Sequence, residues 1–271
     1  MNKRNIAIIV VIGLIVVAAL IWHSTRGSTS GLAKYDNVLV GSSFLSNLNV
    51  PNSVLSQIGI GAAGNFPTKI NGKPALTNTG KPEILYIGAE YCPYCAAERW
   101  PMVIALSRFG TFSNLHYMTS SATDFDASTP TFTFYNSTYQ SSYISFVPVE
   151  MTTNVQAAAN YSGPTMQGYP VLQQLNDSQN NIVSALNPGG GIPFINFANK
   201  SFINGATYSP QILANMNWSN VASQFPEVNS TISESILGSA NLITAAICQA
   251  TNNTPASVCA QSYIQRIESF A

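Results

Sequence analysis

Two cysteines that follow directly on a strand-like apolar run restrict the fold of this chain more than any other feature. Residues 83–88 (Glu-Ile-Leu-Tyr-Ile-Gly) form a compact apolar run rich in β-branched and aromatic residues, which is typical of a buried strand. Cys92 follows four residues after this run, and from Cys95 to Phe109 the apolar residues recur with a helical period. The pattern predicts a strand, a short turn and a helix, with both cysteines at the start of the helix.

A thiol at the start of a helix has a chemical consequence. Unpaired N–H groups and the partial positive charge of the helix end stabilise a thiolate at Cys92. Cys95 lies in the first helical turn, where its thiol can close a small disulfide ring with Cys92. Pro93 and Tyr94 form the dipeptide between them, and Pro93 is tolerated because the first turn needs no N–H donor there. The pair is therefore predicted to be redox-active.

Two other interpretations of this pair stay open, a structural disulfide and half of a zinc site. Structural zinc sites require further ligands, and the chain has only two histidines beside its four cysteines. Cys248 and Cys259 would have to complete a four-thiolate set, but the ten residues between them match no usual zinc spacing. We therefore expect no metal and no other cofactor.

The residues around the cysteine pair resemble a known superfamily. Residues 84–95 (Ile-Leu-Tyr-Ile-Gly-Ala-Glu-Tyr-Cys-Pro-Tyr-Cys) resemble the strand and active-site turn of thioredoxins, glutaredoxins and DsbA-type oxidases. Residues 191–194 (Gly-Ile-Pro-Phe) resemble the superfamily segment in which a cis-proline precedes a strand, lies against the cysteines and helps to bind the substrate. The whole chain resembles membrane-anchored thioredoxin-like proteins of thermoacidophilic archaea. The resemblance implies an α/β, thioredoxin-like fold in which Ile192 and Pro193, joined by a cis bond, face the cysteines.

The chain departs from the thioredoxin pattern in two places. Thioredoxins carry a buried acid in the strand before the cysteines, and the matching residue here is Tyr86, so the proton relay is vacant or moves to Glu90 or Glu98. For Glu98 and its neighbour Arg99, however, a solvated helix face is the favoured interpretation. The second departure is a long insertion over residues 120–190, before the cis-proline strand. Within the insertion, strands are expected at 131–135 and 143–149, and short helices at 154–160 and 171–175.

The part of the chain after the insertion is predicted from local patterns. Residues 194–197 read as a strand, and Asn204-Gly205 is a hairpin turn signal. Two helices, 232–249 and 257–270, are expected to form a C-terminal helical hairpin with a turn at 251–255. The hairpin would bring Cys248 and Cys259 together as a structural disulfide. A second redox pair that shuttles electrons to Cys92 and Cys95 is the alternative.

The first residues indicate where the protein resides. Lys3 and Arg4 precede an unbroken apolar run over residues 6–22, at the lower limit of length for a membrane-spanning helix. Basic residues at this flank stay in the cytoplasm, so the remainder faces outward. We predict a single-pass signal anchor at 1–22, a flexible tether at 23–35 and an extracytoplasmic domain at 36–271, with a cleavable signal peptide as the alternative. Seven glycosylation sequons agree with export, and they begin at Asn136, Asn160, Asn176, Asn199, Asn217, Asn229 and Asn252.

Composition excludes one class of partner. Charged residues make up 8% of the chain, and Lys+Arg and Asp+Glu both number 11, so the clustered positive charge of a nucleic-acid binder is missing. A polar but neutral surface would suit an acidic medium. The alternative explanation is a composition bias of the lineage.

These inferences combine into one functional hypothesis. The chain is expected to be a membrane-anchored thiol–disulfide oxidoreductase that acts on cysteines of exported proteins together with a membrane or soluble redox partner. Cys92 would attack, Cys95 would resolve, and Ile192 and Pro193 would hold the substrate backbone. An outward location favours an oxidase or isomerase over a reductase. The competing hypothesis is a non-catalytic cell-surface binding module with this fold, in which both disulfides are structural.

Overall fold

The computed structural model describes residues 31–270. The predicted signal anchor at 1–22 and residues 23–30 of the predicted tether lie outside the described residues. The helical elements are η1 (Ala33–Tyr35), α2 (Ser42–Asn47), α3 (Asn52–Ile58), α4 (Pro93–Leu106), α5 (Asp177–Leu186), η2 (Pro210–Leu213), α6 (Trp218–Ala222), α7 (Thr231–Ala250), α8 (Ala256–Cys259) and α9 (Ser262–Ile267). The strands are β1 (Thr68–Lys69), β2 (Thr77–Asn78), β3 (Lys81–Gly88), β4 (Gly110–Ser113), β5 (His116–Thr119), β6 (Pro130–Thr133), β7 (Thr138–Ser141), β8 (Ser145–Glu150), β9 (Thr165–Met166), β10 (Tyr169–Pro170), β11 (Phe194–Phe197) and β12 (Ser201–Asn204).

The central sheet is built around β3. Strand β8 pairs with it in parallel, from Glu83 opposite Ser145 to Gly88 opposite Glu150. Strand β11 pairs with β3 antiparallel, and β12 and then β1 continue the sheet beyond β11. Because β8 and β11 bond to the same stretch of β3, they lie on its two opposite edges, which makes β3 a central strand. A central strand buried on both faces explains the continuous apolar run that predicted it.

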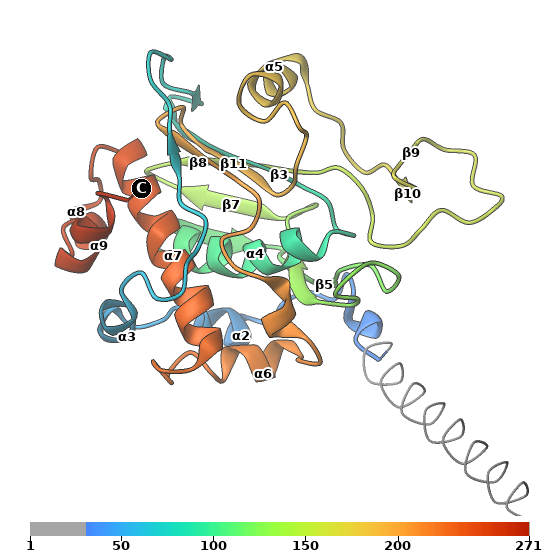
Figure 1. Cartoon of the computed structure of the whole chain (residues 1–271), viewed down its shortest axis with the longest axis horizontal. Helices are drawn as coiled ribbons and strands as arrows, with labels where there is room; N and C mark the ends of the chain where they lie inside the picture. The colour runs from blue at the N-terminus through green and yellow to red at the C-terminus, as the bar shows by residue number, and fades with distance from the viewer. Residues whose placement is uncertain (1–30, 271) are drawn as a thin grey trace, which may run out of the picture.

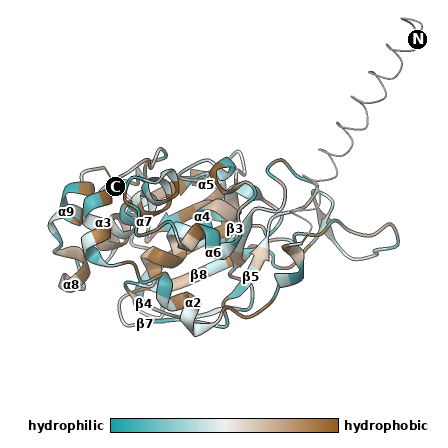
Figure 2. Cartoon of the chain, turned by 90° about the horizontal axis from the view of Figure 1, so that it is seen from below, coloured by the Kyte–Doolittle hydropathy of each residue, from teal (hydrophilic) through white to brown (hydrophobic). Residues whose placement is uncertain are grey.

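Alternate residues of β3 belong to the cores on the two faces of the sheet. Ile84 and Tyr86 belong to the large core that includes α4 and α7. Leu85 and Ile87 pack with apolar residues of α5 on the other face. Figure 1 shows α4 and α7 on one side of the sheet and α5 on the other. The domain is thus a mixed α/β structure with helices on both faces, and Figure 2 shows the apolar residues concentrated on the central elements.

The two central helices are buried nearly all round. In α4 every residue except Tyr94 is buried. Helix α7 is, among the described residues, the one helix long and apolar enough to cross a membrane, but 89% of its apolar window is buried inside the domain. It passes so close to residue 60 that a side chain at Gly238 would place its Cβ 2.3 Å from the Ile60 carbonyl oxygen. Helices apolar on all sides are typical of a protein core, and α7 has that place here.

Several local predictions are confirmed and three are wrong. The strand at 194–197 matches β11. No helix forms at 154–160 or 171–175. Residues 152–172 instead form a long excursion that leaves the end of β8 and folds back on itself, with backbone pairing such as the Ala157 N–H bond to the Gly168 carbonyl. Asn204-Gly205 is not the hairpin turn, since β11 and β12 are joined at Ala198 and Asn199, both of which have positive φ.

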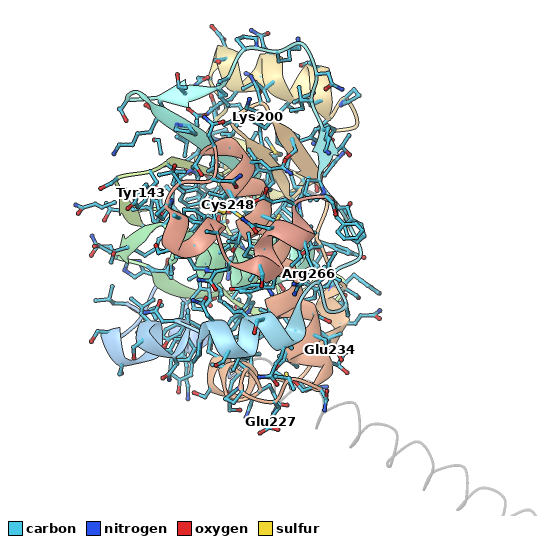
Figure 3. All side chains as sticks on the ribbon, turned by 90° about the vertical axis from the view of Figure 1, so that its left-hand side faces the viewer. Tyr143, Lys200, Glu227, Glu234, Cys248 and Arg266 are labelled. Atoms are coloured by element: carbon cyan, nitrogen blue, oxygen red, sulfur yellow. A yellow bond between two sulfur atoms is a disulfide. The ribbon has the colours of Figure 1, made fainter. Side chains whose placement is uncertain are left out.

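The C-terminal hairpin is confirmed in outline. Helix α7 returns through a turn into α8 and α9, which replace the single second helix that was expected. The chain bends at Gln261, whose backbone is extended, so that α9 packs Tyr263, Ile264 and Ile267 into the core. Figure 3 views this end of the molecule, with Cys248 near its centre. Cys248 and Cys259 form the predicted disulfide, with their Cα atoms 5.6 Å apart and both side chains fully buried.

We predict that this disulfide stabilises the fold and takes no part in exchange. Replacing Cys248 and Cys259 together by serine should lower the free energy of unfolding by about 2–3 kcal/mol, because the bond closes a short loop in the unfolded chain. Thermal and urea unfolding measure this loss, with the Cys92→Ser/Cys95→Ser variant as a matched control. A variant that unfolds like the wild type but no longer exchanges disulfides would instead support the second redox pair.

Candidate functional site

Cys92 caps the N-terminus of α4. Strand β3 ends at Gly88, and Cys92 is the extended residue immediately before the helix, with Pro93 in the first helical position. The Cys92 sulfur accepts a hydrogen bond from the backbone N–H of Cys95 at 3.4 Å. Both cysteines are free thiols; Cys92 is 6% exposed and Cys95 is fully buried. The predicted strand, turn and helix therefore place the two thiols one above the other at the helix start.

The segment predicted to contain a cis-proline lies against Cys92. The Ile192–Pro193 peptide bond is cis, as predicted. The Cys92 thiol lies 4.0 Å from the Ile192 carbonyl oxygen, and Ile192 packs against the small buried cluster that contains both cysteines. Asn187 holds the preceding turn, since its side chain donates to the Gly191 carbonyl and accepts from the Gly191 N–H. Pro193 leads directly into β11, which brings this segment to the same edge of the sheet as the end of β3.

The pKa values of the two thiols shift in opposite directions. The pKa of Cys92 is lowered, first by a hydrogen bond from the Cys95 thiol and further by the Cys95 N–H and the charge of Arg99. The pKa of Cys95 is raised well above its usual value, mainly by burial and then by its hydrogen bond to Cys92. At neutral pH the proton therefore stays on Cys95, and Cys92 is the thiol that more easily becomes the nucleophile.

A buried ion pair lies beneath the cysteines. Arg99 contacts Glu150 through two hydrogen bonds, Nε to Oε1 at 2.8 Å and Nη2 to Oε2 at 2.6 Å, and both side chains are fully buried. Nη2 also donates to the Ala89 carbonyl in the turn before Cys92. The expectation that Arg99 lies on a solvated helix face is wrong, because α4 is packed on all sides. Glu150 closes strand β8, and the sequence signal that could have found it is an acid at the carboxyl end of a strand parallel to β3.

The two predicted relay acids are both buried. Glu98 is fully buried, so its assignment to a solvated face is also wrong; its Oε2 accepts from the N–H and the hydroxyl of Thr207. Glu90 accepts from the Thr133 hydroxyl at 2.6 Å. Burial raises the pKa of each carboxyl to about 7. Neither carboxyl hydrogen-bonds to a cysteine within residues 31–270.

Tyr86 occupies the position of the missing thioredoxin acid. Its ring packs edge-on against Phe134 at 5.1 Å, and the Arg99 guanidinium lies 5.9 Å from the ring centroid. Its hydroxyl is buried without a hydrogen-bond partner in the described part of the chain. Glu150 and Arg99 are charged groups that act on the Cys95 thiol, the first raising and the second lowering its pKa.

Tyr169 is a site residue that the sequence did not single out. It stacks on Tyr91, with ring centroids 4.4 Å apart and planes 6° from parallel, and it belongs to the same buried cluster as both cysteines. Nothing in the local sequence around Tyr169 signals this contact, because it depends on how residues 152–172 fold back onto the cysteine turn.

Over residues 31–270, no group of three or more His, Cys, Asp or Glu side chains is placed to hold a metal ion.

The buried carboxyls make the pH dependence of stability unusual. Glu90 and Glu98 have folded-state pKa values of about 7, and Asp36, which accepts from Asn154 and Thr119, has one of about 6; all exceed the ordinary values near 4. The folded state therefore binds these protons at a higher pH than the unfolded state does. Their contribution to stability grows as the pH falls from about 7 and is complete below the unfolded-state pKa near 4.

We accordingly predict that the free energy of unfolding rises between pH 7 and pH 5, by on the order of 2 kcal/mol for each of Glu90 and Glu98. Urea unfolding across this range measures the change. Glu98→Gln should keep the oxygen that accepts from Thr207, raise stability at pH 7 and flatten the pH dependence. A wild-type stability that declines steadily on acidification from pH 7 to 5 would contradict the prediction.

Comparison with known proteins gives a family but no characterised relative. A family model described as a domain of unknown function, DUF929, matches residues 67–249, which include Cys92 and Cys95, the cis-proline and nearly all of α7. No curated protein and no solved structure matches the chain significantly. Because the family model covers more than half of the sequence, the chain belongs to the DUF929 family.

Proposed function

We propose that the chain is a thiol–disulfide oxidoreductase in which Cys92 and Cys95 alternate between dithiol and disulfide. The observation that carries this proposal is the asymmetry of the two thiols. Cys92 stands at the helix N-terminus with a lowered pKa, and Cys95 is buried beneath it with a raised one. A structural disulfide has no need of such a difference, whereas exchange needs one ready nucleophile and one resolving thiol.

The connectivity supports a thioredoxin-like fold. Strand β3, helix α4 and parallel strand β8 form one unit, and helix α5 follows on the opposite face of the sheet. The antiparallel hairpin of β11 and β12 then begins directly after the cis-proline, and α7 completes the layer that contains α4. In this proposal residues 120–190 contribute strand β8 to the sheet as well as the excursion that carries Tyr169.

The proposed reaction transfers two electrons from substrate thiols to the Cys92–Cys95 disulfide. A substrate thiolate attacks the Cys92 sulfur, the Cys92–Cys95 bond breaks, and Cys95 leaves and takes up a proton. A second substrate thiolate attacks the substrate sulfur of this mixed disulfide, and Cys92 leaves as a thiolate. The substrate now holds a disulfide, and an oxidised redox partner must restore the enzyme. Because a stabilised Cys92 thiolate favours the reduced enzyme, the geometry favours oxidation of substrates over their reduction.

Neighbouring groups support these steps. The Ile192 carbonyl borders the Cys92 sulfur, and together with the adjoining Pro193 it would hold the substrate backbone. Arg99 lowers the pKa of Cys92 and Glu150 contributes to the raised pKa of Cys95. Of the two relay candidates, Glu90 lies in the turn next to the cysteines, whereas Glu98 is held by Thr207. Glu90, with a pKa of about 7, is the better donor or acceptor of the Cys95 proton.

The proposed substrates are cysteines of exported proteins. This part rests on Lys3, Arg4 and the apolar run at 6–22, which would anchor the protein with its domain outside the membrane. The Cys248–Cys259 disulfide fits such an oxidising location.

A redox titration tests the proposal. The purified protein is equilibrated across a glutathione series and its thiols are then alkylated. We expect Cys92 and Cys95 to titrate at a defined potential while Cys248 and Cys259 stay bonded. Cys95→Ser should trap a mixed disulfide with substrate proteins, and Cys92→Ser should not. A Cys92–Cys95 pair that is reduced only after denaturation would instead support a surface binding module.

A second prediction concerns the acidity of Cys92. Thiolate absorbance against pH should give Cys92 a midpoint well below the value of about 8.5 for a free thiol. Replacing Arg99 and Glu150 together by methionine removes both buried charges without leaving one unpaired. In that variant the midpoint of Cys92 should rise, because the guanidinium no longer favours the thiolate. A wild-type midpoint equal to that of a free thiol would contradict the mechanism.

A further inference from the structure

Cys92, whose sulfur must be reached by a substrate, is nearly covered. The residue is 6% exposed, it shares a buried cluster with Tyr91 and Tyr169, and Ile192 packs against that cluster. Of these three, Tyr91 and Ile192 lie in segments fixed by the end of β3 and the start of β11. Tyr169 is 5% exposed, stacks on Tyr91 and donates a hydrogen bond from its hydroxyl to the Ser121 side chain at 2.9 Å. Of these three residues, Tyr169 is thus the one that does not lie next to a strand of the central sheet along the chain.

Tyr169 belongs to a long excursion with few attachments. Residues 152–172 leave the end of β8 and return before α5, and Figure 1 shows them, with β9 and β10, extending beyond the body of the domain. At the base Thr153 bonds to Pro170, and Asn154 donates to Asp36 and to the Thr119 carbonyl; farther out, Gln167 accepts from the Tyr91 hydroxyl. Residues 158–168 between these contacts are exposed throughout. The Tyr169 ring can therefore move off Tyr91 without breaking a strand of the central sheet.

The surface around the covered thiol is rich in apolar side chains, and the loop after β5 and the excursion that contribute to it carry no lysine or arginine. Among the described residues, eleven large hydrophobic side chains are exposed, and five of them come from the cysteine turn, the loop after β5 and the excursion. These five are Tyr94, Phe125, Val155, Tyr161 and Met166. No lysine or arginine occurs between Arg108 and Lys200. Such a surface offers binding energy to an apolar, uncharged polypeptide segment and almost none to a small charged disulfide such as oxidised glutathione.

We propose that Tyr169 covers Cys92 in the free protein and that an extended, apolar segment of a protein substrate displaces it from Tyr91 when exchange occurs. Tyr169 is then a specificity-determining residue that keeps small disulfides from the thiol and admits polypeptides. The inference rests on the redox function proposed above and names its substrate class.

Alkylation of the reduced protein tests the cover without requiring any enzymatic turnover. The measured quantity is the rate constant for the reaction of Cys92 with iodoacetamide, corrected for the fraction of thiolate. Tyr169→Ala should raise this rate constant by roughly tenfold, because the stacked ring pair and one hydrogen bond no longer hold the site closed. Tyr169→Phe keeps the stack and loses the bond to Ser121, so its rate constant should be intermediate. Tyr143→Ala is the matched control, an exposed tyrosine in the loop before β8 and outside this surface, and should alkylate like the wild type. Equal rate constants in the wild type and Tyr169→Ala would overturn the proposal.

Substrate choice is tested with two disulfides. One is oxidised glutathione, and the other is a neutral, apolar, unstructured peptide whose single cysteine is linked to a chromophoric thiol. The Cys92 thiolate attacks the peptide sulfur and releases the chromophore, and Cys95 then displaces the peptide thiolate. The wild type should prefer the peptide, and Tyr169→Ala should reduce that preference by roughly tenfold through faster reaction with glutathione. An unchanged preference would overturn the specificity role. Failure of the redox function itself would appear separately, as a wild type that alkylates at Cys92 but reacts with neither disulfide.

Discussion

The ion pair between Arg99 and Glu150 joins the three elements that meet at the reactive end of the domain. Arg99 stands on α4, Glu150 ends β8, and the Ala89 carbonyl that Arg99 also binds follows β3. Removing two charges from water is costly, and close geometry with additional hydrogen bonds offsets that cost. The same contacts fix the orientation of α4 against the sheet. Since both thiols lie on the first turn of α4, the ion pair also fixes where they stand.

The charges of this sparsely charged chain are placed in a particular way. Most domains lose stability in acid because paired carboxylates must take up protons. Here Glu90, Glu98 and Asp36 are instead buried among neutral hydrogen-bonding groups that suit the protonated acid. Their pKa values are raised by burial, so mild acidification removes charge from the interior rather than breaking pairs. A neutral surface together with such an interior gives a physical basis for function in an acidic medium.

Local patterns predicted the parts of the fold that local forces decide. The apolar run of β3, the strand at 194–197 and the short loop between Cys248 and Cys259 each carry their own signal. The alternation over residues 143–149 likewise indicates a strand where β8 lies, but it does not indicate the partner, because β8 pairs in parallel with a strand distant in sequence. Without that pairing, Glu150 could not be set opposite Arg99. Helical periodicity then misplaced Glu98 and Arg99 at the surface, because it assumes that one face of a helix is solvated.

Strand β8 also separates the charged groups that act on the thiols from the segment that covers Cys92. Its last residue, Glu150, belongs to the ion pair, and the excursion that carries Tyr169 begins two residues later. The root of the excursion is held firmly, since Met151 donates to the Gly88 carbonyl and the Thr152 carbonyl accepts from Glu90. These bonds tie it to the turn before Cys92. Motion of Tyr169 is thereby confined to residues beyond Thr152, so the thiol can be uncovered while the charges that set its pKa stay in place.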